Sequence, residues 1–236
     1  MENKKINKFT FKATFAITLP LIIGYFPVAM AFGLLAKNTA LSFKDTSLMS
    51  VFVFAGASQF MALDLIAAGV STGNIIFATF LLNLRHLMMS ASLSLDLKEI
   101  PKRFIPLVAF GITDESFSVI SFNKDKINLP FLLILNGLSY ASWVVGTMLG
   151  FLVGEILPAT LQASMGIGLY AMFAALLTPE LAKSKEILYL SLIAGLIYTV
   201  TFYLNLFSSG WDIIVSIVLS SFVAVILFDR EGDGCE

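Results

Sequence analysis

Long apolar stretches recur along the whole of this chain and constrain its fold more than any other feature. We predict eight of them, at residues 13–36, 47–70, 73–95, 104–122, 129–153, 163–181, 186–203 and 213–228. A helix rises about 1.5 Å per residue, so about 20 apolar residues cross roughly 30 Å of hydrocarbon. The sequence therefore predicts an all-α, polytopic membrane bundle of about seven or eight transmembrane segments, in which residues 13–228 form one transmembrane domain.

The composition supports the same class of protein. Hydrophobic residues make up 58% of the chain, whereas average proteins contain roughly 45–50%, and the mean hydropathy is +0.89. The segments are long and continuous rather than alternating runs of about ten residues, which argues against a membrane β-barrel. No feature points to nucleic acid, and no room is left for a separate soluble domain. We expect a multi-pass protein of the bacterial inner membrane or its equivalent.

The two ends are polar. Residues 1–12 contain Lys4, Lys5, Lys8 and Lys12 and are expected to form a basic cytoplasmic segment, and residues 229–236 form a short polar tail. The first apolar segment runs on without a small-residue cleavage site, so we predict a retained helix rather than a signal peptide. With eight spans, the excess of Lys and Arg places both termini in the cytoplasm.

The fourth segment, residues 104–122, is the most polar. It is either a wholly enclosed helix or a re-entrant element, because its polar residues do not suit exposure to lipid. If it is re-entrant, its two basic flanks fall on one side of the membrane and the charge bias reverses. The orientation therefore stays open on the sequence alone.

Arg85 lies near the middle of the third segment, in FLLNLRHLMMSASL. An arginine at the centre of a membrane helix costs about 2.5–3.5 kcal/mol on insertion scales, so we expect it to face protein or a water-filled cavity. Its candidate counter-charges are Asp64, Asp114 and Glu115. A carboxylate without a cation in low dielectric tends to stay protonated, which suits these acids to proton coupling. A static buried ion pair is the alternative.

His86 is the only histidine and follows Arg85, about 100° around the helix. Its ordinary pKa suits a proton relay near neutral pH, and a neutral packing role is the alternative. We expect no metal or other cofactor, because no second histidine or nearby cysteine completes a ligand set. The single cysteine, Cys235, lies in the polar tail and cannot form an intrachain disulfide.

Two prolines lie in the first segment. Pro20 and Pro27 cannot donate to the carbonyls four residues before them. We expect a broken first helix whose free carbonyls line a site at the membrane midplane, with a simple packing kink as the alternative. In the second segment, Ser58 and Gln59 offer side-chain hydrogen bonds, either to a ligand or between helices.

Two parts of the chain are also weakly similar to each other in sequence. VAMAFGLLA followed by FAGASQF is similar to VVGTMLGFLVG followed by MGIGLYAMF, which is consistent with an internal repeat of the kind found in transporters. The alternative is that small residues at helix interfaces produce this similarity by chance. Gly146, Gly150 and Gly154 are spaced by four residues, and we expect them to allow close helix packing.

The segments that contain these residues also resemble those of a known protein family. GYFPVAMAFG, FAGASQF, NLRH, FGITDESF and SWVVGTMLG occur in this order between about Pro20 and Phe173, and they resemble the AzlC family, the large subunit of bacterial branched-chain amino acid exporters. The resemblance implies export of leucine, isoleucine or valine, and in some members methionine, driven by the proton gradient. It also implies a small, separately encoded AzlD-like membrane subunit, and the complex could form a higher oligomer.

Residues and resemblance together suggest one site. The candidates for substrate binding are Arg85, Asn83, Gln59, Ser58, Pro27 and Asp114. The candidates for proton coupling are Asp114, Glu115, His86 and Asp64. In this interpretation Arg85 binds the substrate carboxylate through paired hydrogen bonds, and the acids of the TDE motif bind its ammonium group.

Three other functions compete with a carrier. A channel would need a continuous polar path, whereas the polar residues here occur in islands. An assembly subunit would use Arg85 and the acids for stability rather than transport. We do not expect an enzyme, because the chain has neither G-x-S-x-G nor H-E-x-x-H.

Overall fold

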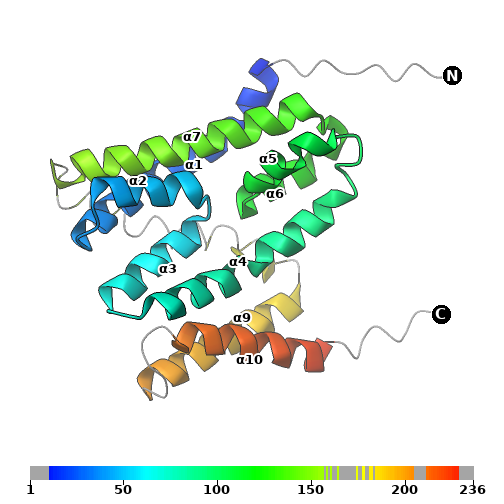
Figure 1. Cartoon of the computed structure of the whole chain (residues 1–236). Coiled ribbons are helices and arrows are strands. Elements are labelled where there is room, and N and C mark those ends of the chain that lie inside the picture. The colour runs from blue at the N-terminus through cyan, green and yellow to red at the C-terminus, as the bar shows by residue number, and fades with distance from the viewer. Residues whose placement is uncertain are drawn as a thin grey trace, which may run out of the picture. The chain divides into compact units, whose positions relative to one another are not determined.

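The structure is a computed structural model, and it describes residues 11–156, 158, 160, 164, 174, 177–178, 181–182, 184–204 and 211–228. Every regular element in this part of the chain is helical, which confirms the all-α prediction (Figure 1). The main helices are α1 Phe11–Asn38, α2 Phe43–Phe52, α3 Gly56–Ala67, α4 Thr72–Ser94, α5 Ile105–Phe110, α6 Asp114–Phe122, α7 Leu129–Val153, α9 Lys185–Tyr203 and α10 Trp211–Phe228.

Two compact units make up the chain. The first comprises Met1–Leu63 and Leu82–Leu169, and the second comprises Asp64–Leu81 and Tyr170–Glu236. Helices α3 and α4 therefore each contribute to both units. All of the polar contacts described below lie in the first unit.

Several predicted segments coincide with single helices. Helix α7 has the predicted bounds, and α1, α4, α9 and α10 begin and end within two residues of the predicted segments. Four helices, α1, α4, α7 and α9, are long and apolar enough to cross a membrane. The predicted segment at 163–181 lies almost entirely outside the described residues, as do the N-terminal ten residues and the polar tail.

The predicted break in the first helix is absent, because α1 is one continuous helix through both prolines. Pro20 and Pro27 lie on its exposed face, while Thr14, Thr18 and Tyr25 are buried. The buried face of α1 packs against α7 over much of its length. Packing on one side therefore holds the helix together where the backbone hydrogen bonds are lost.

Instead, the breaks lie in the second and fourth apolar segments. The segment predicted at 47–70 is divided into α2 and α3, and the segment at 104–122 is divided into α5 and α6. These helices contain 10, 12, 6 and 9 residues, so each is roughly 9–18 Å long and too short to cross a bilayer alone. The prediction of one continuous helix at 47–70 was wrong, whereas the break within 104–122 agrees with the re-entrant alternative given for that segment.

Helices α1 and α7 lie side by side, run in the same direction and make the most extensive helix–helix contact of the first unit (Figure 1). The predicted close packing at the α7 glycines is confirmed. A Cβ at Gly146 would lie 2.8 Å from Ala29 Cβ, and a Cβ at Gly150 would overlap the backbone of Met30. Gly33 of α1 makes the reciprocal approach, since its Cβ would overlap the carbonyl of Thr147.

Helices α2 and α3 form a hairpin that starts and returns at the Val153 end of α7. Phe43, at the start of α2, packs on Phe151 with ring centroids 5.5 Å apart, whereas Phe54 in the break reaches Tyr140. From there α3 turns back, and its Phe60 packs on Phe32 of α1, six positions before the end of that helix. The hairpin tip therefore lies near the middle of α7.

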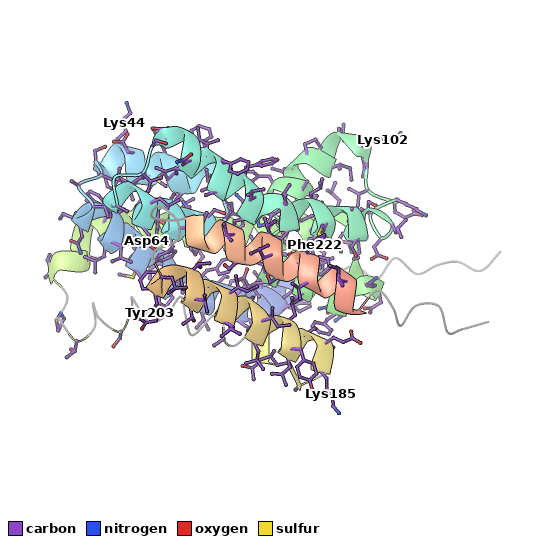
Figure 2. The ribbon with its side chains drawn as sticks, turned by 90° about the horizontal axis from the view of Figure 1, so that it is seen from below. Lys44, Asp64, Lys102, Lys185, Tyr203 and Phe222 are labelled. Carbon is purple, nitrogen blue, oxygen red and sulfur yellow. The ribbon has the colours of Figure 1, made fainter. Side chains whose placement is uncertain are left out.

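Helices α5 and α6 form a second hairpin that enters from the opposite, Leu129 end of α7. Asp96 just after α4 and Lys124 just after α6 form an ion pair with 2.8 Å between Oδ2 and Nζ. The chain therefore leaves α4 and α6 at the same end. Figure 2 shows Lys44 of α2 and Lys102 before α5 at opposite ends of this unit. This geometry is that of a re-entrant element rather than a span.

The two hairpin tips meet at the centre of the unit. Phe54, between α2 and α3, has its ring centroid 6.4 Å from that of Phe110 at the end of α5. Tyr140 of α7 contacts both rings, with centroid distances of 5.5 and 5.6 Å. Helices α3 and α6 therefore both begin near the middle of the unit and run outward in opposite directions.

Side-chain caps explain where several helices begin. Ser42, Thr113, Asn128 and Ser184 each precede a helix, and their side chains accept a hydrogen bond from a backbone N–H in the first turn. Such caps satisfy N–H groups that the helix itself cannot pair. The cap at Thr113 starts α6 at the break, so the sequence itself encodes the tip of the second hairpin.

In the second unit, α9 and α10 pack against each other. Figure 2 labels Lys185 and Tyr203 at the two ends of α9 and Phe222 on α10. Thr201, Ser216 and Ser220 are buried there. Small hydroxyl side chains of this kind are common where membrane helices approach closely.

Candidate functional site

The site is centred on an ion pair between α4 and the tip of the second hairpin. Arg85 Nη1 lies 2.8 Å from Asp114 Oδ2, and the two side chains are 31% and 28% exposed. Asp114 is the first residue of α6, where the helix dipole favours a negative charge. Arg85 Nε has no acceptor among the described residues. The guanidinium therefore retains donor capacity beyond this bond.

Tyr25 of α1 ties the adjacent residues of the same tip to the centre of the unit. Its side chain is 3% exposed, and its hydroxyl lies 2.6 Å from Glu115 Oε2 and 2.5 Å from Thr113 Oγ1. The tyrosine donates to the carboxylate and accepts from the threonine hydroxyl, because each hydroxyl has one proton. Thr113 Oγ1 in turn accepts from the backbone N–H of Ser116. Hydrogen bonds from Tyr25 and the cap formed by Thr113 therefore both hold the start of α6 in place.

A buried chain of hydrogen bonds holds the first hairpin to α7. Trp143 Nε1 donates to Gln59 Oε1 at 2.8 Å, and Gln59 Nε2 donates to Ser50 Oγ at 3.2 Å. Ser50 Oγ also lies 2.8 Å from Thr147 Oγ1. All four side chains are at most 2% exposed. Both the oxygen and the nitrogen of the Gln59 amide are therefore hydrogen-bonded, and this side chain joins α2 and α3 to α7.

Ser58 and Asn83 link α3 with α4 next to Arg85. Ser58 Oγ donates to Asn83 Oδ1 at 2.5 Å, and Ser58 is 1% exposed. Asn83 precedes Arg85 by two positions on α4. The contact sets the position of the arginine-bearing helix against the tip of the first hairpin.

The predicted site residues are thus only partly brought together. Arg85, Asp114 and Glu115 gather at the tip of α6. Pro27 lies on the exposed face of α1. Asp64 belongs to the second unit and is exposed. His86 is half-buried, and its Nε2 has no hydrogen-bond partner among the described residues.

Sequence reasoning missed the aromatic residues that connect the two tips. Tyr25 contacts Phe54 and Trp143, with ring centroids 5.9 and 5.7 Å apart. Tyr25 stands in GYFPVAMAFG and Trp143 in SWVVGTMLG, both among the motifs that carry the family resemblance. A tyrosine or tryptophan in the middle of an apolar span needs a partner for its O–H or N–H, and this requirement was the available signal.

No group of three His, Cys, Asp or Glu side chains in the described part of the chain could hold a metal ion. The cluster instead presents one guanidinium, two carboxylates and several hydroxyls at the ends of short helices. Such a set can bind a charged organic molecule and exchange protons.

Comparison with known proteins identifies the family that the sequence motifs resemble. The family model described as AzlC protein matches residues 20–157. An uncharacterized membrane protein of Archaeoglobus fulgidus is 38% identical over 173 residues, 72% of this chain and 76% of that protein. No solved structure matches.

Two named relatives are more informative. The inner membrane protein YgaZ of Escherichia coli is 31% identical over 218 residues, 89% of this chain and 87% of that protein. The branched-chain amino acid transport protein AzlC of Bacillus subtilis is 26% identical over 181 residues, 75% of this chain and 70% of that protein. The family match covers more than half of the chain and includes both hairpins. The chain is a multi-pass membrane protein and belongs to the AzlC family.

Proposed function

We propose that this protein is a secondary transporter that exports leucine, isoleucine and valine, with methionine as a further substrate, in exchange for protons. The observation that carries the proposal is the pair of Arg85 and Asp114 at the tip of a re-entrant hairpin. Opposite charges at membrane depth mark substrate and ion pathways in transporters. The name of the Bacillus subtilis relative supplies the substrate class.

The ion pair offers complementary charges for an amino acid zwitterion. Arg85 binds the carboxylate through its free donors, and Asp114 binds the ammonium group. Both side chains are about one-third exposed, so a ligand can reach them without unfolding the tip. Phe54 packs on Tyr25, which binds Glu115, and provides apolar surface next to this tip.

Exchange with protons follows from competition at Asp114. A proton on this carboxylate removes the negative charge that the substrate ammonium needs, so proton and amino acid exclude each other. Glu115 is the second acid of the tip, and its bond to Tyr25 makes it sensitive to movement of α6. His86 and Asp64 remain further candidates for the proton path.

The two hairpins supply the moving parts. Discontinuous helices whose ends meet near the midplane are a recurrent way to build a transporter site. Here the α2–α3 and α5–α6 hairpins enter from opposite ends and meet at a cluster of aromatic rings. Small displacements of one tip against α1 and α7 would open the ion pair to one side at a time. The predicted internal repeat, which pairs residues 28–36 on α1 with residues 144–154 at the end of α7, stays part of the proposal.

The placement of the basic residues supports one orientation of the molecule in the membrane. Lys98, Lys102, Arg103, Lys124 and Lys126 all fall at the Leu129 end of α7, whereas Lys37 and Lys44 fall at the other end. The positive-inside rule then places the Leu129 end, and with it the start of α1, in the cytoplasm. Because α5–α6 and α2–α3 both re-enter, the predicted eight spans are reduced in this proposal.

Function as the large subunit of a two-component exporter is the final part of the proposal. The family resemblance implies a small AzlD-like partner, so transport assays need that subunit in the membrane. Apolar side chains of α4 and α9, such as Leu87 and Leu192, are exposed and available for contact with lipid or with the small subunit.

The decisive experiment measures efflux of labelled valine from proteoliposomes that contain this chain and its small partner. The vesicles are compared with and without an inward proton gradient for wild type, Arg85→Ala and Asp96→Asn. Asp96 is a matched control, because it also pairs with a basic side chain at 2.8 Å but lies at the end of α4. Proton-stimulated efflux that only Arg85→Ala abolishes supports the proposal.

Other outcomes select the competing functions. Loss of complex assembly in Arg85→Ala, with no effect on preassembled complexes, indicates an assembly subunit. Efflux without saturation or counterflow indicates a channel. Absence of valine, leucine and isoleucine movement in the wild type rejects the substrate class.

A further inference from the structure

A groove of about 300 Å³ lies between the end of α4 and helix α5, and neither Arg85 nor Asp114 lines it. This volume is at the lower end of the range for small-molecule sites, about 300–1,000 Å³. All of its lining residues belong to the first unit. Ser94 and Ala109 in its walls are exposed, so the groove is open along its side.

The lining residues follow one face of each helix. On α4 and the turn after it they are spaced by four positions, at Ser90, Ser94 and Lys98. On and around α5 they are spaced by three or four positions, at Lys102, Ile105, Ala109 and Ile112. Such spacings place side chains on the same side of a helix. The groove therefore runs along both helices for about 12–15 Å.

The two ends of the groove differ in chemistry. Helix α4 runs toward the Leu129 end of α7 and α5 runs away from it, so Lys98 and Lys102 both lie at the outer end. Ile112 lies at the inner end, next to Thr113 at the start of α6. The floor between the ends is apolar and consists of Leu97, Ile100, Ile105 and Ala109.

Neither lysine at the outer end is paired with an acid in the described part of the chain. Both side chains are exposed. Of the acids near them in sequence, Asp96 is already bound by Lys124 at 2.8 Å, and Glu99 does not line the groove. A concave site lined by charges of one sign concentrates ions of the opposite sign. The outer end therefore favours an anion.

The position of the groove in the membrane restricts the anion further. Helix α4 is long and apolar enough to cross a membrane, and Lys98 follows its last residue by four positions. Lysine side chains just beyond the end of such a helix reach the headgroup region. The inner end of the groove approaches the tip of the second hairpin and hence lies at the depth of the hydrocarbon. The groove thus matches a molecule with an anionic group and a long apolar chain.

We propose that this groove binds an anionic phospholipid of the surrounding bilayer. The lipid phosphate pairs with Lys98 and Lys102, and the first part of one acyl chain lies on Ile105, Ala109 and Ile112. Basic pockets between membrane helices on the cytoplasmic side are known to bind such headgroups. A free phosphate ion would use only the two lysines and leave the apolar floor uncovered. This site and ligand differ from the amino acid site proposed at Arg85.

A bound lipid braces the second hairpin. Ala109 is near the end of α5, and Ile112 lies in the break that precedes Asp114. An acyl chain that packs on both residues resists displacement of the tip away from α4. We therefore expect anionic lipid to raise the rate of efflux. This effect rests on the proposed function, whereas binding of the lipid does not.

Three probes test which ligand the groove takes. Dioleoylphosphatidylglycerol and dioleoylphosphatidylcholine have the same acyl chains, but only the first has a net negative charge, and sn-glycerol 3-phosphate has the phosphate without the chains. Each is titrated into the full chain in neutral detergent, and bound molecules are counted by native mass spectrometry. We expect the phosphatidylglycerol to bind about tenfold more tightly than the phosphatidylcholine, because two lysines attract its charge. Equal affinities of the two lipids, or equally tight binding of the glycerol phosphate, would overturn the proposal.

Charge variants test the outer end. Lys98→Gln combined with Lys102→Gln is expected to abolish the preference for phosphatidylglycerol. The matched control combines Lys12→Gln with Lys44→Gln, which removes the same charge from two exposed lysines outside the groove. We expect the control to keep the tenfold preference. A preference that survives in the first double variant would reject the two lysines as the headgroup site.

A filling variant tests the apolar floor. Ala109→Leu places a larger apolar side chain in the groove at an exposed position of α5, and it is expected to weaken binding of phosphatidylglycerol about tenfold. Ala141→Leu, at an exposed position of α7 outside the groove, is the matched control. Unchanged binding in Ala109→Leu would reject this groove. Loss of the lipid from wild type when the small subunit is added would assign the groove to that subunit instead.

Efflux measurements separate the lipid site from the proposed function. In proteoliposomes, we expect valine efflux to be faster with phosphatidylglycerol than with phosphatidylcholine alone in wild type, and to be equal in the Lys98 and Lys102 double variant. Selective lipid binding without any valine transport upholds the groove and rejects the proposed function. Valine transport without selective lipid binding does the reverse. Selective binding that leaves the efflux rate unchanged would reject the bracing of the hairpin.

Discussion

Phe54 and Phe110 lie with their ring centroids 6.4 Å apart, although each reaches that point from an opposite end of α7. The contact joins the tips of two short-helix hairpins that are 56 residues apart in sequence. Aromatic pairs of this kind contribute about 0.5–1.5 kcal/mol beyond their burial, which is weak enough to be broken and remade. A contact of this strength is therefore compatible with movement of one hairpin tip against the other.

Asp114→Asn is expected to remove the pH dependence of efflux. In the proposed exchange, wild-type efflux is expected to rise as the external pH falls, because protonation of Asp114 on the outer side would release the substrate. Asparagine keeps a hydrogen-bonding side chain next to Arg85 but cannot take up the proton. The rate of valine efflux at two external pH values measures the effect.

Asp96→Asn serves as the control for that experiment, since it removes a carboxylate of similar exposure, 27%, from an ion pair whose lysine is 59% exposed. Exposed pairs contribute about 0–1 kcal/mol, so we expect this variant to transport like wild type. An Asp114→Asn protein whose efflux still rises at low external pH would exclude Asp114 from proton coupling.

Tyr25→Phe is expected to loosen the start of α6. The substitution keeps the ring contacts with Phe54 and Trp143 but removes the hydroxyl that binds Glu115 and Thr113. Leaving buried polar groups without a partner costs about 1–3 kcal/mol. We expect a lower melting temperature of the purified protein and slower efflux. Tyr189→Phe, at a position 55% exposed on α9, is expected to change neither, and an equal loss in both variants would contradict the role of Tyr25.

Gly150→Ala is expected to destabilise the protein by about 1–3 kcal/mol or more. Alanine normally favours a helix by up to about 1 kcal/mol over glycine. At this position, however, the added Cβ would overlap the backbone of Met30, which cannot move away without separating α1 from α7. The measurement is the fraction of protein that stays monodisperse after heating in detergent.

Gly24→Ala is the matched substitution, because the new Cβ there meets no neighbouring atom. We expect it to leave stability unchanged or slightly raised. If both alanine variants were equally stable, the close packing of α1 on α7 would be wrong.

Labelling of single cysteines is expected to show re-entry of α5–α6. In a Cys235→Ser background, cysteines introduced at Lys98 and Lys124 lie on the same side of the membrane in this structure, whereas one at Lys44 lies on the other. A membrane-impermeant thiol reagent added to sealed vesicles measures the side. Labelling of positions 98 and 124 from opposite sides would mean that residues 104–122 span the bilayer.

The sequence by itself determined the class of protein and much of its helical content. Apolar length predicts a membrane helix because every backbone group in hydrocarbon needs an internal partner, so α4, α7 and α9 could be predicted almost to the residue. The cost of a charge in the membrane likewise predicted that Arg85 needs a counter-charge, and it left Asp64, Asp114 and Glu115 as choices.

Tertiary structure alone decided the breaks, the ion-pair partner and the residues that join the hairpins. Apolar content is the same for one continuous helix and for two short ones that fold back, so hydropathy did not reveal the ends of α2 and α5. Prolines suggested a break in α1, but packing on α7 keeps that helix whole. Asp114 became the partner of Arg85, and Tyr25 that of Glu115, because the α5–α6 tip returns against α1 and α4, a contact between distant segments that no local pattern encodes.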